Sequence, residues 1–258
     1  MPASQLVSLL GAVLLLLGIA AAVSRVDDLQ VARESVTVVL RAAVQLIAVA
    51  TVIRFVFRTP VLAPVYLVAM LAVAAWTSSR RLRAENVSGV YVATTAAIAA
   101  GAAATVAVVL ATRALPLDVR QVVPFAAQII GGAMTATTLA SLRLLDDTQA
   151  SWHEVEGWLA IGAPPRVAVS GLGRRAAARA LVPVLDQTRN VGLVVLPGAF
   201  VGLLLGGASP IEAGRLQLLV LVGLIAAQTL AAAIVTTMLG EAMGTTRPGR
   251  VVENSVRA

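Results

Sequence analysis

The sequence LQLLVLVGLIAAQTLAAAIVTTML, residues 216–239, decides the fold of this protein. It contains no charged side chain. As an α-helix it would extend for about 36 Å at 1.5 Å per residue, which is longer than the roughly 30 Å hydrocarbon core of a bilayer. An uninterrupted apolar run of this length predicts a transmembrane helix rather than a buried strand or a helix of a soluble core. We therefore expect a membrane protein.

Similar apolar runs recur along the whole chain. They predict about seven transmembrane helices, at residues 6–23, 35–57, 61–77, 90–111, 122–142, 182–205 and 216–239. The third run is short and the sixth contains the polar sequence DQTRN, so six or eight crossings are alternatives. Apolar residues make up 59% of the chain and charged residues 13%, against about 45–50% and about 25% in soluble domains. We expect an all-α, polytopic membrane bundle.

Residue usage excludes several kinds of chemistry. All 20 basic residues are arginine, so the chain has no lysine for an ATP-binding P-loop or a Schiff base. It also has no cysteine, which excludes disulfides and thiolate sites. The single histidine, His153, has no nucleophile or acid arranged around it as an active site requires. We expect no enzyme activity, no cofactor and no metal site in this chain.

The arginines also predict the orientation of the chain. With the N-terminus outside, 13 of them fall on the cytoplasmic side and five on the outer side, as the positive-inside rule requires. Arginine beside apolar spans is typical of anionic lipid contact, and we expect no nucleic acid partner despite the net charge of +7. Residues 1–240 then form one domain in the plasma membrane with a cytoplasmic insert at 143–180, followed by a polar cytoplasmic tail at 241–258.

The insert contains the sequence WHEVEGWLAIGAPPRVA, residues 152–168. Ser151, with Glu154 three positions later, predicts a capped helix start, and Gly162 followed by two prolines predicts its end. A second helix with Arg174, Arg175 and Arg179 should lead into the sixth span. The first helix has one apolar face, formed by Trp152, Val155, Trp158, Leu159 and Ile161. Periodicity alone leaves two partners open for this face, a docked protein or the lipid headgroup region.

A family resemblance favours the docked protein. The sequence EVEGWLAIGA, residues 154–163, resembles the coupling motif by which ABC transporter permeases dock onto their ATPase subunits. Three further blocks resemble one permease family in order and spacing: RESVTVVLRAAVQLIAVATVIRFVF at 33–57, AQIIGGAMTATTLASLRLLDD at 127–147 and VGLVVLPGAFVGLLLGGASPIEAGRLQ at 191–217. That family includes the bacterial iron export permease FetB and the plant aluminium-sensitivity permease.

The resemblance implies a specific role. The chain would be the permease subunit of an ABC exporter of iron, another metal or a small solute, and a homodimer would face two separate ATPase subunits that bind ATP. It implies that the coupling residues are Trp152, Glu154, Val155, Glu156, Trp158, Leu159, Ile161 and Gly162. Two alternatives remain, an ion-coupled secondary transporter and a membrane transmitter that moves no solute. The first should show buried carboxylates and unwound helices, and the second a large outer domain.

Polar residues within the predicted spans are candidates for the substrate path because they are costly in lipid. They are Arg41, Gln45, Gln128, the run from Asp186 to Asn190, and Gln228, with Asp186 and Asn190 as the main candidates of that run. The alternative is that they bond helices to one another, with Arg41 and Asp186 as one possible pair. Small residues at Gly198, Gly202 and Gly206, and at Ala97, Gly101 and Thr105, predict close helix packing. The break at Pro197 and Gly198 predicts a kink, and possible roles of that kink include a gate.

Overall fold

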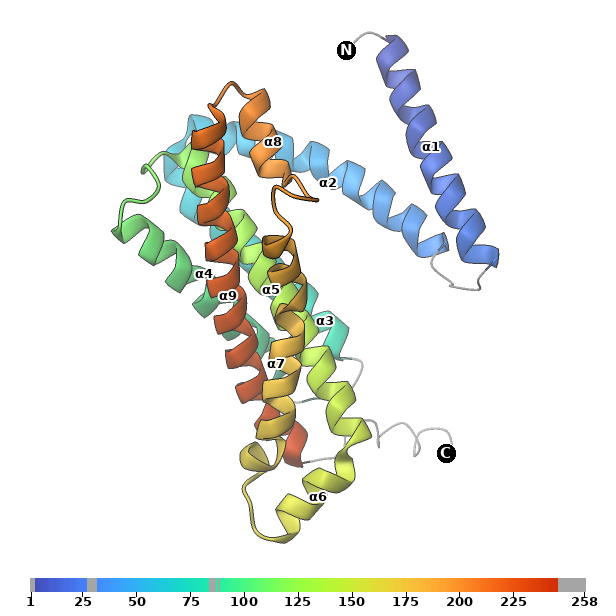
Figure 1. Cartoon of the computed structure of the whole chain (residues 1–258), viewed down its shortest axis with the longest axis vertical. Helices are drawn as coiled ribbons and strands as arrows, with labels where there is room; N and C mark the ends of the chain where they lie inside the picture. Colours follow the sequence, from blue (N-terminus) through green and yellow to red (C-terminus); the bar gives the residue numbers. More distant parts are fainter. Residues whose placement is uncertain (1–2, 27–31, 84–86, 88, 246–258) are drawn as a thin grey trace. The chain divides into compact units, whose positions relative to one another are not determined.

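The computed structural model describes residues 3–26, 32–83, 87 and 89–245, and its regular elements are helices (Figure 1). In chain order they are α1 (Ala3–Val26), α2 (Ala32–Arg58), the 3₁₀ turn η1 (Pro60–Leu62), α3 (Ala63–Arg83), α4 (Val90–Ala111), α5 (Val119–Ala150), α6 (Trp152–Ala160), α7 (Pro165–Arg189), α8 (Gly198–Leu205) and α9 (Pro210–Thr245). The chain divides into two compact units at residues 61 and 62. The first contains α1 and α2, which pack against each other.

The second unit is organised around α9, which packs against α4, α5 and α7. Helix α5 also contacts α3, α4 and α7, so these five helices share one core. Figure 1 places α6 at one end of this bundle and α8 beside the start of α9 at the other. The two ends of the unit are therefore joined by the long helices α5, α7 and α9.

The interior of this bundle contains many small side chains beside larger ones such as Ile98 and Leu144. Ala97, Ala133 and Ala231 are fully buried, whereas larger apolar side chains such as Val92 and Val108 are exposed. A soluble protein has the opposite arrangement, and so large an apolar exterior requires a lipid environment. The expectation of an all-α membrane protein is confirmed.

Glycine brings the helix backbones into contact. A Cβ atom added to Gly101 of α4 would lie 2.5 Å from the carbonyl oxygen of Ala227 in α9. The predicted small-residue face of Ala97, Gly101 and Thr105 is therefore confirmed, because all three residues are buried and the face packs on α9. In contrast, a Cβ on Gly198 or Gly202 would meet no other atom within 4 Å among the described residues. Packing through that second face stays a prediction for a further copy of the chain.

Five helical segments are long and apolar enough to cross a membrane. They are Ser35–Arg58, Pro60–Leu82, Val90–Ala111, Val119–Ala150 and Pro210–Thr245. They correspond to the predicted second, third, fourth, fifth and seventh spans. The first predicted span lies in α1, where Gly11–Ser24 forms a shorter apolar helical segment. The third is longer than expected, because α3 continues to Arg83. Within this extension, the guanidinium of Arg80 lies over the Trp76 ring, 5.0 Å from its centroid.

The sixth predicted span, residues 182–205, is wrong as a single helix. Helix α7 begins in the insert and ends at Arg189, and the chain then turns before α8 starts at Gly198. Pro197 precedes α8 directly and cannot continue a helix from the residues before it. Gly192 lies in the turn with a left-handed backbone, φ +78°, a conformation that glycine adopts without a steric cost.

The ends of two spans also differ from prediction. Helix α5 continues to Ala150, and α9 continues to Thr245, so residues 241–245 of the predicted tail are helical. The rest of that tail lies outside the described residues. Apolar runs mark only the part of a helix in lipid, and a helix extends beyond the bilayer wherever neighbouring helices still pack on it.

Candidate functional site

The predicted insert folds as a short helix, α6, held between two long ones. Helix α6 ends as expected, because Gly162 adopts a left-handed backbone with φ +84°. The Gly162 N–H donates to the carbonyl of Leu159 at 3.0 Å, and the Ala163 N–H donates to that of Trp158 at 3.0 Å. These two bonds form a Schellman motif. Pro164 then caps α7, so the change of direction is fixed locally.

The start of α6 differs in detail from the expected capping box. Ser151 occupies the N-cap position, but its side chain makes no capping hydrogen bond. Glu154 does not return to Ser151 as a capping box requires. Its carboxylate instead lies 3.9 Å from the guanidinium of Arg175 in α7. A tertiary contact has replaced the local one.

The apolar residues of α6 divide between two faces, which corrects the prediction of one projecting face. Trp152 is 8% exposed and Val155 is fully buried, and Leu159 also packs against the core. Trp158 and Ile161 are 46% and 75% exposed. The first three therefore fix α6 to the bundle, and the last two are available to a partner. Docking of an ATPase through these two residues stays a prediction.

Two ion pairs add to this attachment. Arg179 of α7 donates to Asp147 of α5 at 3.1 Å, and Arg175 lies beside Glu154 of α6 as described above. Both arginines follow the start of α7 by several turns, so one helix contacts α5 and α6 together.

A cleft of about 370 Å³ lies between α5, α7, α8 and α9. Its lining includes the glutamines Gln128, Gln187, Gln217 and Gln228. It brings together two predicted path residues, Gln128 and Gln228, with the predicted break at Pro197 and Gly198. Among the described residues, no charged side chain lines it. The arrangement offers amide donors and acceptors in an otherwise apolar cleft.

Gln217 is the most deeply buried of these four side chains. It is 5% exposed, and its Oε1 atom has no hydrogen-bond partner among the described residues. A buried amide oxygen without a partner costs roughly 1–3 kcal/mol. Such a cost is typical of a group reserved for a ligand or a water molecule. Gln228 is also buried, and Gln128 and Gln187 are exposed toward the opening.

The turn that closes one side of this cleft is held by backbone hydrogen bonds alone. The carbonyl of Asn190 accepts the N–H groups of Val194 and Val195 at 3.1 and 3.2 Å, and the Gly192 N–H donates to Val195 at 3.0 Å. Pro197 follows and begins α8. Residues 192–196 of this segment are exposed, so little side-chain packing holds it.

The other predicted path residues lie elsewhere. Asp186 is exposed near the end of α7 and accepts a hydrogen bond from Arg189 at 3.1 Å. Asn190 is exposed in the turn. Arg41 and Gln45 are exposed on α2 in the first unit, and a pair between Arg41 and Asp186 stays a prediction.

Gln217 was not singled out as a path residue from the sequence, whereas Gln187 belongs to the predicted run Asp186 to Asn190. The spacing of Gln217 from Gln228 could have identified it, because residues eleven apart on a helix lie on nearly the same face. Gln187 follows Asp186 in the polar sequence DQTRN, and nothing in that sequence distinguishes it from its neighbours. Among the described residues no group of three or more His, Cys, Asp or Glu side chains is placed to hold a metal ion.

The sequence matches a family described as "Uncharacterised protein family (UPF0014)" over residues 7–243. The chain belongs to the UPF0014 family. Within it, this chain is 36% identical to the rice protein "UPF0014 membrane protein STAR2" over 219 residues, 84% of the chain and 76% of the relative. It is 35% identical to the Arabidopsis "Protein ALUMINUM SENSITIVE 3" over 233 residues, 88% of the chain and 81% of the relative.

A bacterial UPF0014 relative carries a functional name. The Escherichia coli protein "Probable iron export permease protein FetB" is 29% identical over 223 residues, 86% of this chain and 85% of that protein. The family resemblance read from the sequence is thus confirmed. No solved structure matches the chain at a significant level.

Proposed function

We propose that this UPF0014 chain is the membrane permease subunit of an ABC-type exporter, powered by an ATPase on a separate chain. The observation that carries the proposal is the attachment of α6. Its buried Trp152 and Val155 fix it to the bundle while Trp158 and Ile161 remain exposed. A partner that binds the exposed pair would move α6, and with it the helices that line the glutamine cleft.

The mechanical link runs through α5 and α7. Helix α5 carries Asp147 near α6 and Gln128 at the cleft, and α7 carries Arg179 near α6 and Gln187 at the cleft. Rigid helices transmit a displacement along their length. Closure of the ATPase subunits would therefore change the width of the cleft, and two copies of the chain would enclose one path. The sequence lacks lysine, which supports hydrolysis of ATP on the partner.

The cleft favours solutes held through hydrogen bonds. Amide groups line it. Imidazole, thiolate and carboxylate groups, the usual ligands of transition metals, are absent from its lining in the part of the chain that the structure describes. Iron enters this proposal through the name of the relative FetB. If iron is the cargo, we propose that it passes as a hydrated or chelated ion and not as a bare ion ligated by this cleft.

The experiment is transport in vesicles that contain the chain and its ATPase. Inside-out vesicles expose the cytoplasmic face and its ATPase to the medium, so ATP is added outside. Uptake of radioactive ferrous iron and of iron complexes is then followed, with an ATPase whose catalytic glutamate is replaced as the control. ATP-dependent uptake with the active partner supports the proposal. Failure of the chain to copurify with any ATPase, together with transport that needs no ATP, rejects it.

One observation favours a second candidate, an ion-coupled secondary transporter. The unwound segment 190–197 between α7 and α8 is the kind of interruption that such transporters use at their binding sites. Against it, none of the described residues that line the cleft is a carboxylate able to carry a proton or sodium ion. Uptake that follows an imposed ion gradient in vesicles without an ATPase would support this candidate instead.

A further inference from the structure

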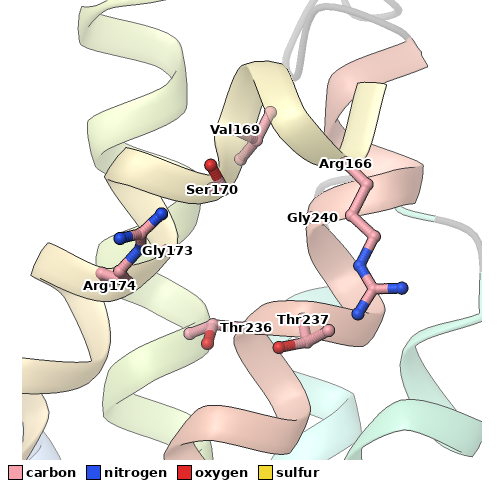
Figure 2. Close-up of a pocket in the computed structure, with 8 residues that line it drawn as sticks. All are labelled: Arg166, Val169, Ser170, Gly173, Arg174, Thr236, Thr237 and Gly240. Atoms are coloured by element: carbon pink, nitrogen blue, oxygen red, sulfur yellow. The ribbon is translucent and has the colours of Figure 1, made fainter. Parts of the chain in front are cut away.

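A second hollow, of about 200 Å³, lies between α7 and α9 at the end of the bundle near α6 (Figure 2). Arg166, Ser170 and Arg174 border it from α7, and Thr236 and Thr237 border it from α9. Figure 2 shows the two guanidinium groups on opposite sides of the hollow, with the threonines between them on the facing helix. This site shares no residue with the glutamine cleft.

The hollow exists because glycine brings α7 and α9 together. A Cβ added to Gly173 would lie 3.6 Å from the Thr236 Cβ, and one added to Gly240 would lie 3.9 Å from Val169. At this separation the helices are in contact, yet neither glycine has a side chain to fill the groove beside the contact. The floor is therefore backbone, and the walls are the long arginine side chains.

The charges of α7 are unevenly balanced around this hollow. Three of its arginines have acidic partners: Arg175 with Glu154, Arg179 with Asp147 and Arg189 with Asp186. Within the described part of the chain, Arg166 and Arg174 have no ion pair, and no acidic residue lines the hollow. Both guanidinium groups are exposed, so an anion that enters the hollow would meet two unpaired arginines.

The hydroxyl groups narrow the choice of ligand. Ser170, Thr236 and Thr237 each donate to a carbonyl of their own helix, at 2.8, 2.9 and 2.7 Å. Because the one hydroxyl donor is already used, their oxygens can only accept further hydrogen bonds. They cannot donate to an anion, but they can accept from a hydroxyl group of a ligand. The guanidinium fork matches the oxygens of a phosphate. A phosphate that carries hydroxyl groups therefore fits both kinds of side chain.

The hollow lies at a membrane boundary. Thr236 and Thr237 are near the end of the apolar run 216–239, where the hydrocarbon core gives way to headgroups. One face of α9 continues toward the middle of that run through the exposed Leu230. The face of α7 that carries Arg174 continues through the exposed Leu185, eleven residues further along the helix. A headgroup in the hollow would leave its acyl chains beside these apolar side chains.

From this geometry we propose that the hollow between Arg166 and Arg174 binds the phosphate of an anionic phospholipid headgroup such as phosphatidylglycerol. The two arginines hold the phosphate, and the hydroxyl oxygens of Ser170 and Thr237 accept from the headgroup hydroxyls. The same phosphate chemistry could come from a soluble phosphate, and the experiment below separates the two sources. The proposal does not depend on which solute is transported.

The test is retention of defined lipids by the purified full-length chain, measured by native mass spectrometry. The protein is equilibrated with equal amounts of phosphatidylglycerol and phosphatidylcholine. Wild type is expected to retain phosphatidylglycerol preferentially, and the double variant R166Q/R174Q is expected to lose about tenfold or more of that preference, given the attraction of each arginine to anionic lipid. The matched control is R175Q/R179Q, which removes the same charge from paired arginines of the same helix and should keep the preference.

Each outcome decides one part of the proposal. An equal loss in both double variants would show attraction to general positive charge and would overturn the site. Displacement of the lipid by millimolar inorganic phosphate would assign the site to a soluble phosphate and would overturn the lipid as ligand. If R166Q/R174Q does not remain folded by circular dichroism, R166Q and R174Q are measured singly, and retention unchanged in both would also overturn the site.

Discussion

The indole nitrogen of Trp152 donates a hydrogen bond to the carboxylate of Glu156, 2.6 Å away and one turn further along α6. The ring itself is buried against the bundle, while Glu156 is exposed. The two tryptophans of α6 thus have different surroundings, since Trp158 lies on the exposed face. Substitutions at these two positions should separate the attachment of α6 from its docking.

Replacing Trp158 by glutamate is expected to uncouple transport from ATP hydrolysis. A charge in the centre of a desolvated apolar contact removes about 2 kcal/mol or more of binding, which corresponds to an ATPase affinity roughly 30-fold lower. The fold should be unaffected because the side chain is already exposed. The measurement is copurification of the ATPase with the variant, together with its melting temperature. Unchanged copurification and transport would contradict docking through this residue.

Replacing Trp152 by alanine is expected to act on stability instead. Truncation of a buried tryptophan costs about 3–5 kcal/mol, so the melting temperature should fall and α6 should become accessible to protease. Trp152→Phe is the control, because it keeps most of the buried ring and loses only the bond to an exposed carboxylate. A W152A variant as stable as wild type would show that α6 is not fixed through this side chain.

The sequence predicts helices better than it predicts where they stop. The apolar runs located the helices because lipid imposes a hydrophobic requirement on every exposed position. They did not reveal the end of α7 at Arg189, because the residues after it are as apolar as a span. There Pro197 and the left-handed Gly192 override the hydropathy pattern.

The candidate sites were predictable only in part. Helical spacing placed Trp152 and Trp158 near one face, but which of them is buried depends on where α5 and α7 cross α6, and that is tertiary information. Gln128 and Gln228 were found as polar residues in spans, whereas Gln187 and Gln217 join them only through the packing of α7 and α9. Arg175 and Arg179 form ion pairs with Glu154 and Asp147, whereas Arg166 and Arg174 have no acidic partner among the described residues. The spacing of the arginines along the sequence does not predict this difference.

The contact between α4 and α9 predicts a severe effect for Gly101→Ala. The added Cβ would lie 2.5 Å from the Ala227 carbonyl oxygen, and backbone cannot rotate away as a side chain can. The helices must separate, at a cost of about 1–3 kcal/mol. Gly131→Ala is the matched control, since its Cβ would meet no other atom within 4 Å among the described residues. Thermal unfolding in detergent compares the two, and equal melting temperatures would refute the close packing.

Gln217→Leu is expected to lower transport without lowering stability. The native Oε1 atom has no partner among the described residues, so leucine removes an unpaired polar group, and the free energy of unfolding should stay equal or rise by about 1 kcal/mol. Transport should fall by about tenfold if the amide contacts the solute. The melting temperature measures the effect on stability, and ATP-dependent uptake in vesicles measures the effect on transport.

The control for Gln217 is Gln149→Leu. Gln149 belongs to α5 but lies near its end, outside the glutamine cleft. Loss of transport in both variants would point to a general effect of the substitution. A strongly destabilised Q217L protein would show instead that the amide has a structural partner.

The turn between α7 and α8 gives the last prediction. Gly192 has φ +78°, and a residue with a Cβ costs about 1–2 kcal/mol in this conformation. Gly192→Ala should therefore relax the turn and shift Pro197 and Gly198, which line the cleft. Because this turn has little other packing, we expect a small change in melting temperature and a large loss of transport. Gly214→Ala in α9 is the control, as its Cβ has open space and its backbone is not left-handed. If G192A transports normally, the turn has no part in opening the cleft, and the interruption between α7 and α8 is a fixed kink.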